Sequence, residues 1–307
     1  MIKASAVTKR YGEKTAVADL SFTVKPGVVT GFLGPNGAGK STTMRMIMGL
    51  DAPTSGSVTV NGKAYAEHAA PLREVGALLE AKAIHGGRTA YHHLLALALT
   101  TGIPRRRVDE VIDLVGLRSV ARQRSGGFSL GMGQRLGVAA ALLGDPATLV
   151  LDEPVNGLDP EGILWIRNLL RALAAEGRTV FVSSHLMSEM ALTADHLIVI
   201  GRGRLIADVS VRDFTNLASR NVVRVRTPEA TRLRDLLVSA DVTVTSEEPG
   251  LLEVVGMNSE AIGRAACAAA IPLIELTPVQ ASLEEAFMEI TQDAVEYRVD
   301  DQDRSVA

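Results

Sequence analysis

Short apolar runs alternate with segments of helical spacing along the first part of the chain. Val28–Leu33, Thr148–Leu151 and Thr179–Val182 are short runs of mainly apolar residues, which predict buried strands. Helical spacing follows the first of these runs at Gly39–Met48 and appears again at Pro160–Glu176. Short buried strands that alternate with helices are typical of a mostly parallel sheet covered by helices, so we expect an α/β fold.

The segment from about residue 89 to 144 interrupts this alternation because it lacks strand patterns. We predict that it forms a helical subdomain within a first domain that spans residues 1–214. A run of three arginines, Arg105–Arg107, stands where one of its helices is expected to begin, and such a run is typical of a solvated face.

The order of predicted strands and helices changes near residue 222 and predicts a second, smaller α+β domain. Its expected strands are 222–225, 242–245, 251–255 and 273–276, and its expected helices are 229–239 and 259–270. The order strand–helix–strand–strand–helix–strand is that of a ferredoxin-like unit. Ser282 and Glu285 form a capping-box pattern that opens a final helix to about Gln292. We therefore assign residues 215–295 to this domain and expect the polar residues 296–307 to be disordered.

The two predicted domains differ in charge. The formal net charge of −3 combines +5 over residues 1–214 with −8 over residues 215–307, where 8 Arg and no Lys face 16 Asp and Glu. A solvated acidic surface is the simplest interpretation of the second value. An acidic domain would repel phosphates, so we expect no nucleic-acid partner.

The composition indicates in which cellular compartment the protein works. Cys267 is the only cysteine, so no internal disulfide can form, which fits a reducing compartment. The first residues show no signal-peptide pattern, and no stretch approaches the roughly 20 apolar residues that cross a bilayer. If the protein works at a membrane, we expect it to act at one membrane surface without crossing the bilayer.

The clearest chemical motif is Gly34-Pro-Asn-Gly-Ala-Gly39-Lys40-Ser41, which fits the phosphate-binding pattern G-x-x-x-x-G-K-[ST]. It follows a predicted strand and opens a predicted helix, as that motif requires. Glycines let successive backbone N–H groups point at phosphate oxygens, and the helix adds its positive end. Lys40 would contact the β- and γ-phosphates, and the Ser41 hydroxyl would bind Mg²⁺. The expected nucleotide-binding residues of this loop are Gly34, Asn36, Gly37, Ala38, Gly39, Lys40, Ser41 and Thr42.

A pair of carboxylates, Asp152 and Glu153, ends the apolar run Thr148–Leu151. Taken alone, such a pair is more typical of a solvated junction between a strand and a loop than of a metal site. Beside a phosphate loop, however, the first acid can bind Mg²⁺, and the second can orient an attacking water as a general base.

The order and spacing of these motifs resemble the nucleotide-binding domain of ATP-binding-cassette (ABC) transporters over about residues 1–214. The resemblance implies that Tyr11 stacks on adenine and that Ser129 and Gly131 belong to a signature motif that contacts the nucleotide of the opposite subunit. It also implies that Asp159 belongs to a loop at the dimer interface and that His185 contacts the γ-phosphate.

The chain departs from the family pattern at two positions. Leu130 replaces the first glycine of the signature, and Glu80 stands where the family has a glutamine that ligates Mg²⁺. Ala77-Leu-Leu-Glu80, Ser129-Leu-Gly-Met132 and the tail around Ser282–Phe287 resemble the bacterial branch that exports drugs and antibiotics.

The resemblance implies an ATPase that binds ATP and Mg²⁺ (through Ser41, Asp152 and Glu80) and dimerises with a second copy on binding ATP. It also implies a separate integral membrane permease, which would hold the protein at the cytoplasmic face of the membrane. Two alternatives stay open at this point: a soluble ABC ATPase that acts on ribosomes or DNA, and the ATPase of an importer.

Overall fold

The computed structural model describes residues 1–79, 84–218, 222–279 and 282–291. The chain divides into two compact units, Met1–Val211 together with Thr291, and Arg212–Ile290. The boundary expected at residue 215 falls inside a helix, α8 (Val211–Ala218). The two units are described separately below.

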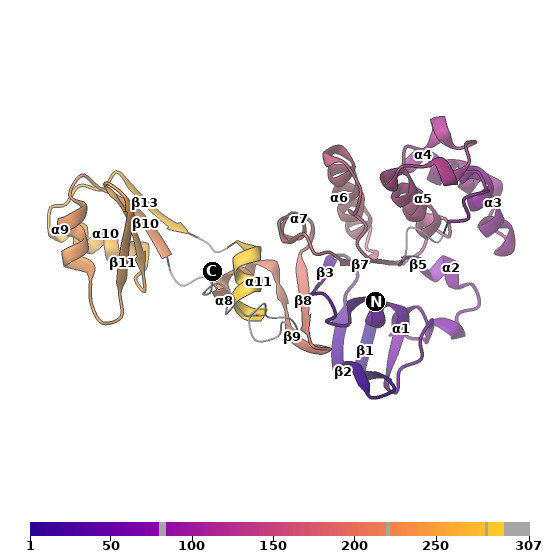
Figure 1. The fold of residues 1–307 in the computed structure, drawn as a ribbon, viewed down its shortest axis with the longest axis horizontal. Helices are drawn as coiled ribbons and strands as arrows, with labels where there is room; N and C mark the ends of the chain where they lie inside the picture. Colours follow the sequence, from indigo (N-terminus) through magenta and orange to yellow (C-terminus); the bar gives the residue numbers. More distant parts are fainter. Residues whose placement is uncertain (80–83, 219–221, 280–281, 292–307) are drawn as a thin grey trace, which may run out of the picture. The chain divides into compact units, whose positions relative to one another are not determined.

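A six-stranded sheet in the order β5-β6-β7-β3-β8-β9 forms the centre of the first unit (Figure 1). Its first five strands are parallel, and β9 pairs with β8 in the antiparallel direction. Every residue of β3, β6 and β7 is buried, which explains why these strands appear in the sequence as continuous apolar runs. The strands are β3 (Val29–Leu33), β5 (Val75–Leu78), β6 (Thr148–Leu151), β7 (Thr179–Ser183), β8 (His196–Gly201) and β9 (Arg204–Ser210).

A second sheet, in the order β2-β1-β4, is wholly antiparallel. Its strands are β1 (Ile2–Tyr11), β2 (Lys14–Val24) and β4 (Ser55–Val60). Three buried rings join it to the central sheet: Phe22 of β2 lies 5.9 Å from Phe32 of β3 and 5.8 Å from Phe181 of β7, between ring centroids. This aromatic cluster fixes the two sheets against each other directly below the loop that follows β3.

Seven α-helices are described in the first unit and lie around the central sheet. Three of them, α3, α4 and α5, pack on one another and form the helical part expected between residues 89 and 144 (Figure 1). The helices are α1 (Lys40–Ile47), α2 (Pro71–Glu74), α3 (Ala90–Thr100), α4 (Arg105–Leu114), α5 (Leu130–Leu142), α6 (Pro160–Ala175) and α7 (Met187–Thr193).

Helix α5 approaches strand β5 so closely that one glycine has no room for a side chain. A Cβ atom added at Gly76 would lie 1.9 Å from the carbonyl oxygen of Ala141. We expect Gly76→Ala to lower the free energy of unfolding by about 1–3 kcal/mol or more, because backbone must move to admit the methyl group. Urea unfolding followed by circular dichroism measures the change.

Gly133→Ala is the matched control for this prediction, because no atom lies within 4 Å of an added Cβ there. In helix α5 that change should stabilise the protein by up to about 1 kcal/mol. Equal urea midpoints for the Gly76→Ala variant and the wild type would show that α5 and β5 are not held at this distance.

The second unit has the topology that its sequence predicts. Its antiparallel strands stand in the order β11-β12-β10-β13, which is the ferredoxin-like arrangement. Helices α9 and α10 cover one face through a core that includes Val223, Leu233, Val254 and Ile262. The elements are β10 (Val222–Arg226), α9 (Ala230–Leu237), β11 (Thr243–Glu248), β12 (Leu251–Val255), α10 (Ser259–Ala268), β13 (Glu275–Val279) and α11 (Leu283–Thr291).

Of two further predictions for this unit, the start of its last strand is wrong by two residues and the capping box is confirmed. The strand expected at 273–276 begins later, at Glu275, because Ile274 donates its N–H to Arg226 outside the ladder and the pairing partners of β10 start at Glu275. The capping box at the final helix is confirmed: the backbone N–H of Ser282 donates to Glu285 Oε2 at 2.7 Å, and that of Glu285 donates to Ser282 Oγ at 3.1 Å. Residues 296–307, which were expected to be disordered, lie outside the described residues.

In the described parts of the chain, none of the helices has both the length and the apolar character of a membrane span.

Candidate nucleotide-binding site

The loop between β3 and α1 carries the phosphate-binding motif, and its glycines are required by the backbone. Gly39, which precedes the first residue of α1, has φ 102°, a conformation that side chains with a Cβ rarely adopt. An added Cβ would also lie 2.6 Å from the carbonyl oxygen of Ala16 at Gly39, and 2.4 Å from that of Ile200 at Gly34. The loop therefore curls tightly between β3 and α1. The first backbone N–H groups of α1 have no acceptor within the helix, which suits them to bind phosphate oxygens.

Lys40 reaches back across this loop. Its Nζ donates to the carbonyl oxygen of Gly34 at 2.6 Å and to that of Pro35 at 3.3 Å, and its side chain is largely buried. Burial lowers the pKa of the Lys40 ammonium, and the charges of Glu153 and Asp152 partly offset that effect. A cation held in this position is ready to exchange the loop carbonyls for phosphate oxygens.

Two oxygen ligands suited to a magnesium ion meet beside Lys40. The Ser41 hydroxyl donates to Asp152 Oδ2 at 2.8 Å, although 111 positions separate the two residues in sequence. The hydroxyl of Ser183, at the end of β7, donates to the other oxygen, Asp152 Oδ1. Magnesium prefers hard oxygen ligands and is commonly held by one or two carboxylates together with nucleotide phosphates, so this donor set fits it.

Glu153 lies next to the same ligands but turns its side chain towards His185. His185 Nδ1 lies 2.7 Å from Glu153 Oε2, and the His185 backbone N–H donates to the same oxygen at 3.3 Å. The backbone N–H of Glu153 donates to Ser183 Oγ at 3.0 Å. Asp152 and Glu153 are thus held in different directions by one serine, as expected for adjacent residues with separate tasks.

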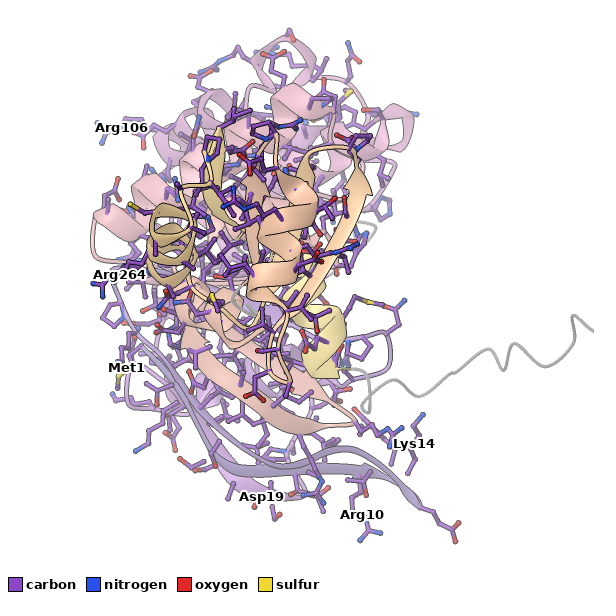
Figure 2. The ribbon with its side chains drawn as sticks, turned by 90° about the vertical axis from the view of Figure 1, so that its left-hand side faces the viewer. Met1, Arg10, Lys14, Asp19, Arg106 and Arg264 are labelled. Atoms are coloured by element: carbon purple, nitrogen blue, oxygen red, sulfur yellow. The ribbon has the colours of Figure 1, made fainter. Side chains whose placement is uncertain are left out.

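Lys40, Ser41, Asp152 and Glu153 border one open cleft of about 470 Å³. Gly34 and His185, also expected in the site, are not part of its lining; each is linked to it by a hydrogen bond, to Lys40 and Glu153 respectively. Tyr11 and Lys14 lie on its rim, and Lys14 projects away from the end of the β1–β2 hairpin (Figure 2). The Tyr11 ring is half exposed, and its hydroxyl donates to Asp51 Oδ2 at 3.0 Å. Arg45 also donates to that oxygen, at 2.7 Å. The other sequence-predicted residues that line the cleft are Asn36, Gly37, Ala38, Gly39, Lys40, Ser41, Thr42, Asp152 and Glu153.

The signature residues Ser129 and Gly131 are not among the lining of this cleft. Ser129 is the N-cap of α5, because its Oγ accepts from the backbone N–H of Met132 at 3.2 Å. Asp159 caps α6 in the same way, accepting from Gly162 at 2.9 Å. Both caps stand at exposed helix starts. None of these three residues therefore lines the nucleotide cleft of its own chain, and their expected role towards a second subunit stays a prediction.

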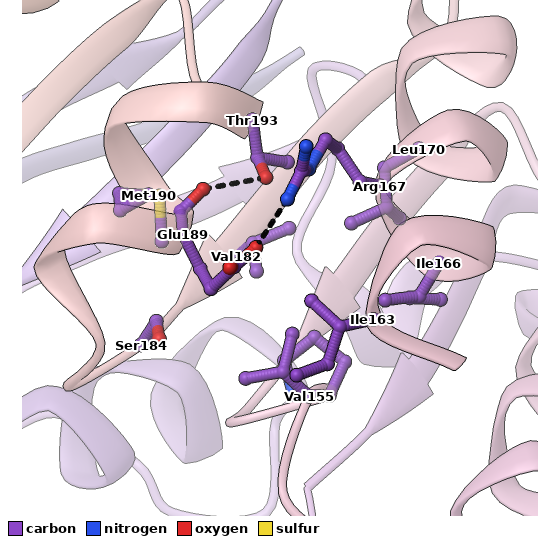
Figure 3. A pocket seen from close by; sticks show the side chains of 11 residues that line it. Val155, Ile163, Ile166, Arg167, Leu170, Val182, Ser184, Glu189, Met190 and Thr193 are labelled. Atoms are coloured by element: carbon purple, nitrogen blue, oxygen red, sulfur yellow. Dashed lines mark hydrogen bonds and ion pairs between the residues drawn. The ribbon is translucent and has the colours of Figure 1, made fainter. Parts of the chain in front are cut away.

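An ion pair links the two helices that follow Glu153 and His185. Arg167 of α6 donates to Glu189 of α7 at 2.7 Å, and the Glu189 carbonyl accepts from Thr193 Oγ1 at 2.7 Å (Figure 3). The narrow pocket beside this pair is lined by Val155, in the loop after Glu153, and by Ser184, next to His185. The loops that contain Glu153 and His185 therefore both pack against α6 and α7.

Two residues of the site, Ser183 and Gln134, were not among those expected from the sequence. Ser183 bonds to both Asp152 and Glu153, and Gln134 donates from Nε2 to the Glu153 carbonyl at 2.9 Å. The position of Ser183 at the end of a buried strand, two residues before His185, was a usable signal. Glu80, expected to ligate magnesium, lies in residues 80–83, outside the described residues.

Comparisons with known proteins agree with this geometry. The family described as "ABC transporter" matches residues 17–156, and a domain of unknown function matches residues 221–284. The bacitracin transport ATP-binding protein BcrA of Bacillus licheniformis is 43% identical over 72% of this chain and 72% of its own length. An uncharacterized ABC transporter ATP-binding protein of Bacillus subtilis, YhcH, is 38% identical over 94% of this chain and 95% of its own.

A solved structure shares the fold of the first unit. The dimeric structure of a bacterial ABC transporter cassette is 25% identical, with a TM-score of 0.63, and the match covers 68% of this chain and 98% of that one. Together with the geometry of the cleft, these matches identify the chain as an ATP-binding, ATP-hydrolysing member of the ABC transporter family.

Proposed function

We propose that this protein is the ATPase subunit of an exporter of drugs, antibiotics or other amphipathic compounds, and that it drives a separate integral membrane permease from the cytoplasmic face. That the protein hydrolyses ATP is supported by one observation: Lys40, Asp152 and Glu153 line the same cleft. The 43% identity to a bacitracin transport ATP-binding protein supports the exporter part.

We propose that two copies of the chain enclose the nucleotide between them. Each copy supplies Lys40, Asp152, Glu153 and His185 to one ATP. It supplies the exposed N-cap Ser129, and Gly131 in the first turn of α5, to the ATP of the partner. This division explains why the signature residues lie away from the cleft of their own chain. Because neither copy completes a site, binding of ATP would join the two and hydrolysis would release them, which is the movement that does work.

Within that dimer, the residues of the cleft divide the chemistry. Ser41 and Asp152 would hold Mg²⁺, which neutralises the developing charge on the phosphates when it is bound. Glu153 orients a water and accepts its proton as the water oxygen bonds to the γ-phosphorus and the bond to the ADP oxygen breaks. Lys40 stabilises the charge that collects on the β- and γ-phosphate oxygens. His185, hydrogen-bonded to Glu153, would contact the γ-phosphate.

A second groove suggests how the permease is linked to this reaction. An open groove of about 540 Å³ is lined mainly by apolar side chains, among them Leu50, Tyr65 and Leu79. Ser41 and Asp152 line this groove as well as the nucleotide cleft. We propose that a short segment of the permease occupies it, since a partner seated there would touch the two groups that hold the metal.

The transport proposal is tested by purification from native membranes. We expect the tagged full-length protein, solubilised in detergent, to bring down a multi-span hydrophobic protein in near-equal amount, identified by mass spectrometry. Replacing Leu79 in the groove by Glu should weaken this association at least about tenfold, because a buried unpaired charge is costly. An exposed leucine elsewhere on the unit, Leu164, gives the matched control Leu164→Glu.

Recovery only from the soluble fraction, alone or with ribosomes, would contradict the exporter proposal and leave the ATPase assignment intact. We propose that the second unit, with the sequence-derived limits 215–295, is an accessory domain, which agrees with its match to a domain of unknown function.

A further inference from the structure

The backbone of Glu153 has an unusual conformation. Its φ angle is 51°, in the left-handed region that residues with a side chain rarely adopt. This conformation turns the Glu153 side chain away from Asp152, so that the two adjacent carboxylates face different partners. Left-handed backbone at a residue other than glycine persists only where the surroundings hold it, so the contacts of this peptide decide where the carboxylate stands.

Two buried side chains hold the peptide groups on either side of Glu153. Ser183 Oγ accepts from the Glu153 N–H at 3.0 Å, and Gln134 Nε2 donates to the Glu153 carbonyl oxygen at 2.9 Å. The exposed fractions of Ser183 and Gln134 are 0% and 3%. A buried amide that lost this acceptor would leave polar groups unpaired, so the bond is a defined constraint and not an incidental contact.

Gln134 belongs to helix α5, which begins immediately after Ser129. The first turn of this helix also touches the loop that follows Glu153: a Cβ added at Gly157 would lie 2.3 Å from Leu130 Cδ2, and one added at Gly131 would lie 2.8 Å from the Gly157 carbonyl oxygen. Helix α5 therefore contacts the loop on both sides of Pro154, once through Gln134 and once through its N-terminal turn. A rigid helix with two such contacts transfers its displacement to the loop.

We infer that Gln134 is a positioning residue for hydrolysis: it fixes the Glu153 peptide and thereby ties the general base of one site to the helix that contacts the ATP of the other. The inference rests on the proposed function of Glu153 as base and of Ser129 as a group that acts on the partner's nucleotide. It assigns a role to Leu130 as well, because the larger side chain at the usual glycine position makes the second contact with the loop.

The test is a pair of variants that keep the shape of Gln134 and remove its donor. In the full-length protein, Gln134→Met and Gln134→Glu should lower kcat for ATP hydrolysis by about tenfold or more, because a misplaced base loses the alignment that its reaction needs. KM for Mg-ATP should change less than about twofold, since Lys40 and the phosphate loop are untouched. Leu136→Met, at a fully buried position of the same helix, is the matched control and should keep wild-type kcat.

A second measurement separates positioning from damage to the helix. When Glu153 is already Gln, adding Gln134→Met should cause no further loss in single-turnover hydrolysis of radiolabelled ATP, and the ATP-dependent dimer should form at the same ATP concentration. Equal kcat in the Gln134→Met variant and the wild type, or a tenfold loss that persists in the Glu153→Gln background, would overturn the inference. A wild-type protein without ATPase activity would overturn both the inference and the proposed function.

Discussion

Glu153→Gln should abolish most ATP turnover while leaving ATP bound between two copies of the chain. We expect kcat to fall by a factor of about 10² to 10⁴, the usual contribution of a general base. The glutamine side chain keeps an oxygen acceptor for the His185 N–H, which Glu153 Oε2 now accepts at 3.3 Å, so the loop should keep its shape. If hydrolysis opens the dimer, as we propose, size-exclusion chromatography in Mg-ATP should show a stable dimer of the variant.

The control for this prediction is Glu161→Gln, which removes an exposed carboxylate in the first turn of α6. It should leave turnover within about twofold of wild type, as is usual for surface substitutions. If the Glu153→Gln variant turned over ATP at the wild-type rate, Glu153 would not be the base. If it lost turnover without forming a dimer, ATP binding alone would not join the two copies.

The sequence predicts the centre of this site well because the relevant contacts are made by short continuous motifs. A strand, a tight glycine loop and a helix start determine where Lys40 and Ser41 lie, and the loop needs Gly39 at φ 102°. The carboxylates follow from the same logic, since parallel strands end at one edge of the sheet and β6 places Asp152 there. Ser41 and Asp152, which we propose to hold Mg²⁺, could therefore be placed together although 111 positions separate them.

The sequence could not reveal contacts that depend on how helices pack. Nothing in the pattern around Gln134 indicates that its amide reaches the Glu153 carbonyl, because that bond depends on the position of α5 against the sheet. The sequence does not predict the left-handed backbone of Glu153 either, since the residue is not a glycine and no turn motif marks it. In the second unit the strand order was predictable from the alternation of elements, whereas the start of β13 at Glu275 depended on its register with β10.

Lys40→Met should weaken nucleotide binding strongly while leaving the empty protein folded. Each charge-assisted hydrogen bond is worth about 1.5–3 kcal/mol, so losing the lysine should weaken Mg-ATP binding by about 10- to 100-fold. Burial lowers the pKa of Lys40, which means that the folded state disfavours the charged form and that holding the ammonium there costs folding free energy at neutral pH. Methionine has a similar length and carries no charge, so the Tm of the empty variant should stay within about 2 °C of wild type or rise.

The Tm gain on adding Mg-ATP is the decisive measurement, because a ligand stabilises the folded state only as far as it binds it. We expect the Lys40→Met variant to lose most of this gain at an ATP concentration that only just saturates the wild type. Lys14→Met removes an exposed cation from the rim of the same cleft and should keep most of the gain, since long-range attraction from an exposed charge is screened by salt. Equal losses in the two variants would mean that the cleft attracts ATP by its overall charge, and a full gain in the Lys40→Met variant would mean that the loop binds phosphate through its backbone N–H groups alone.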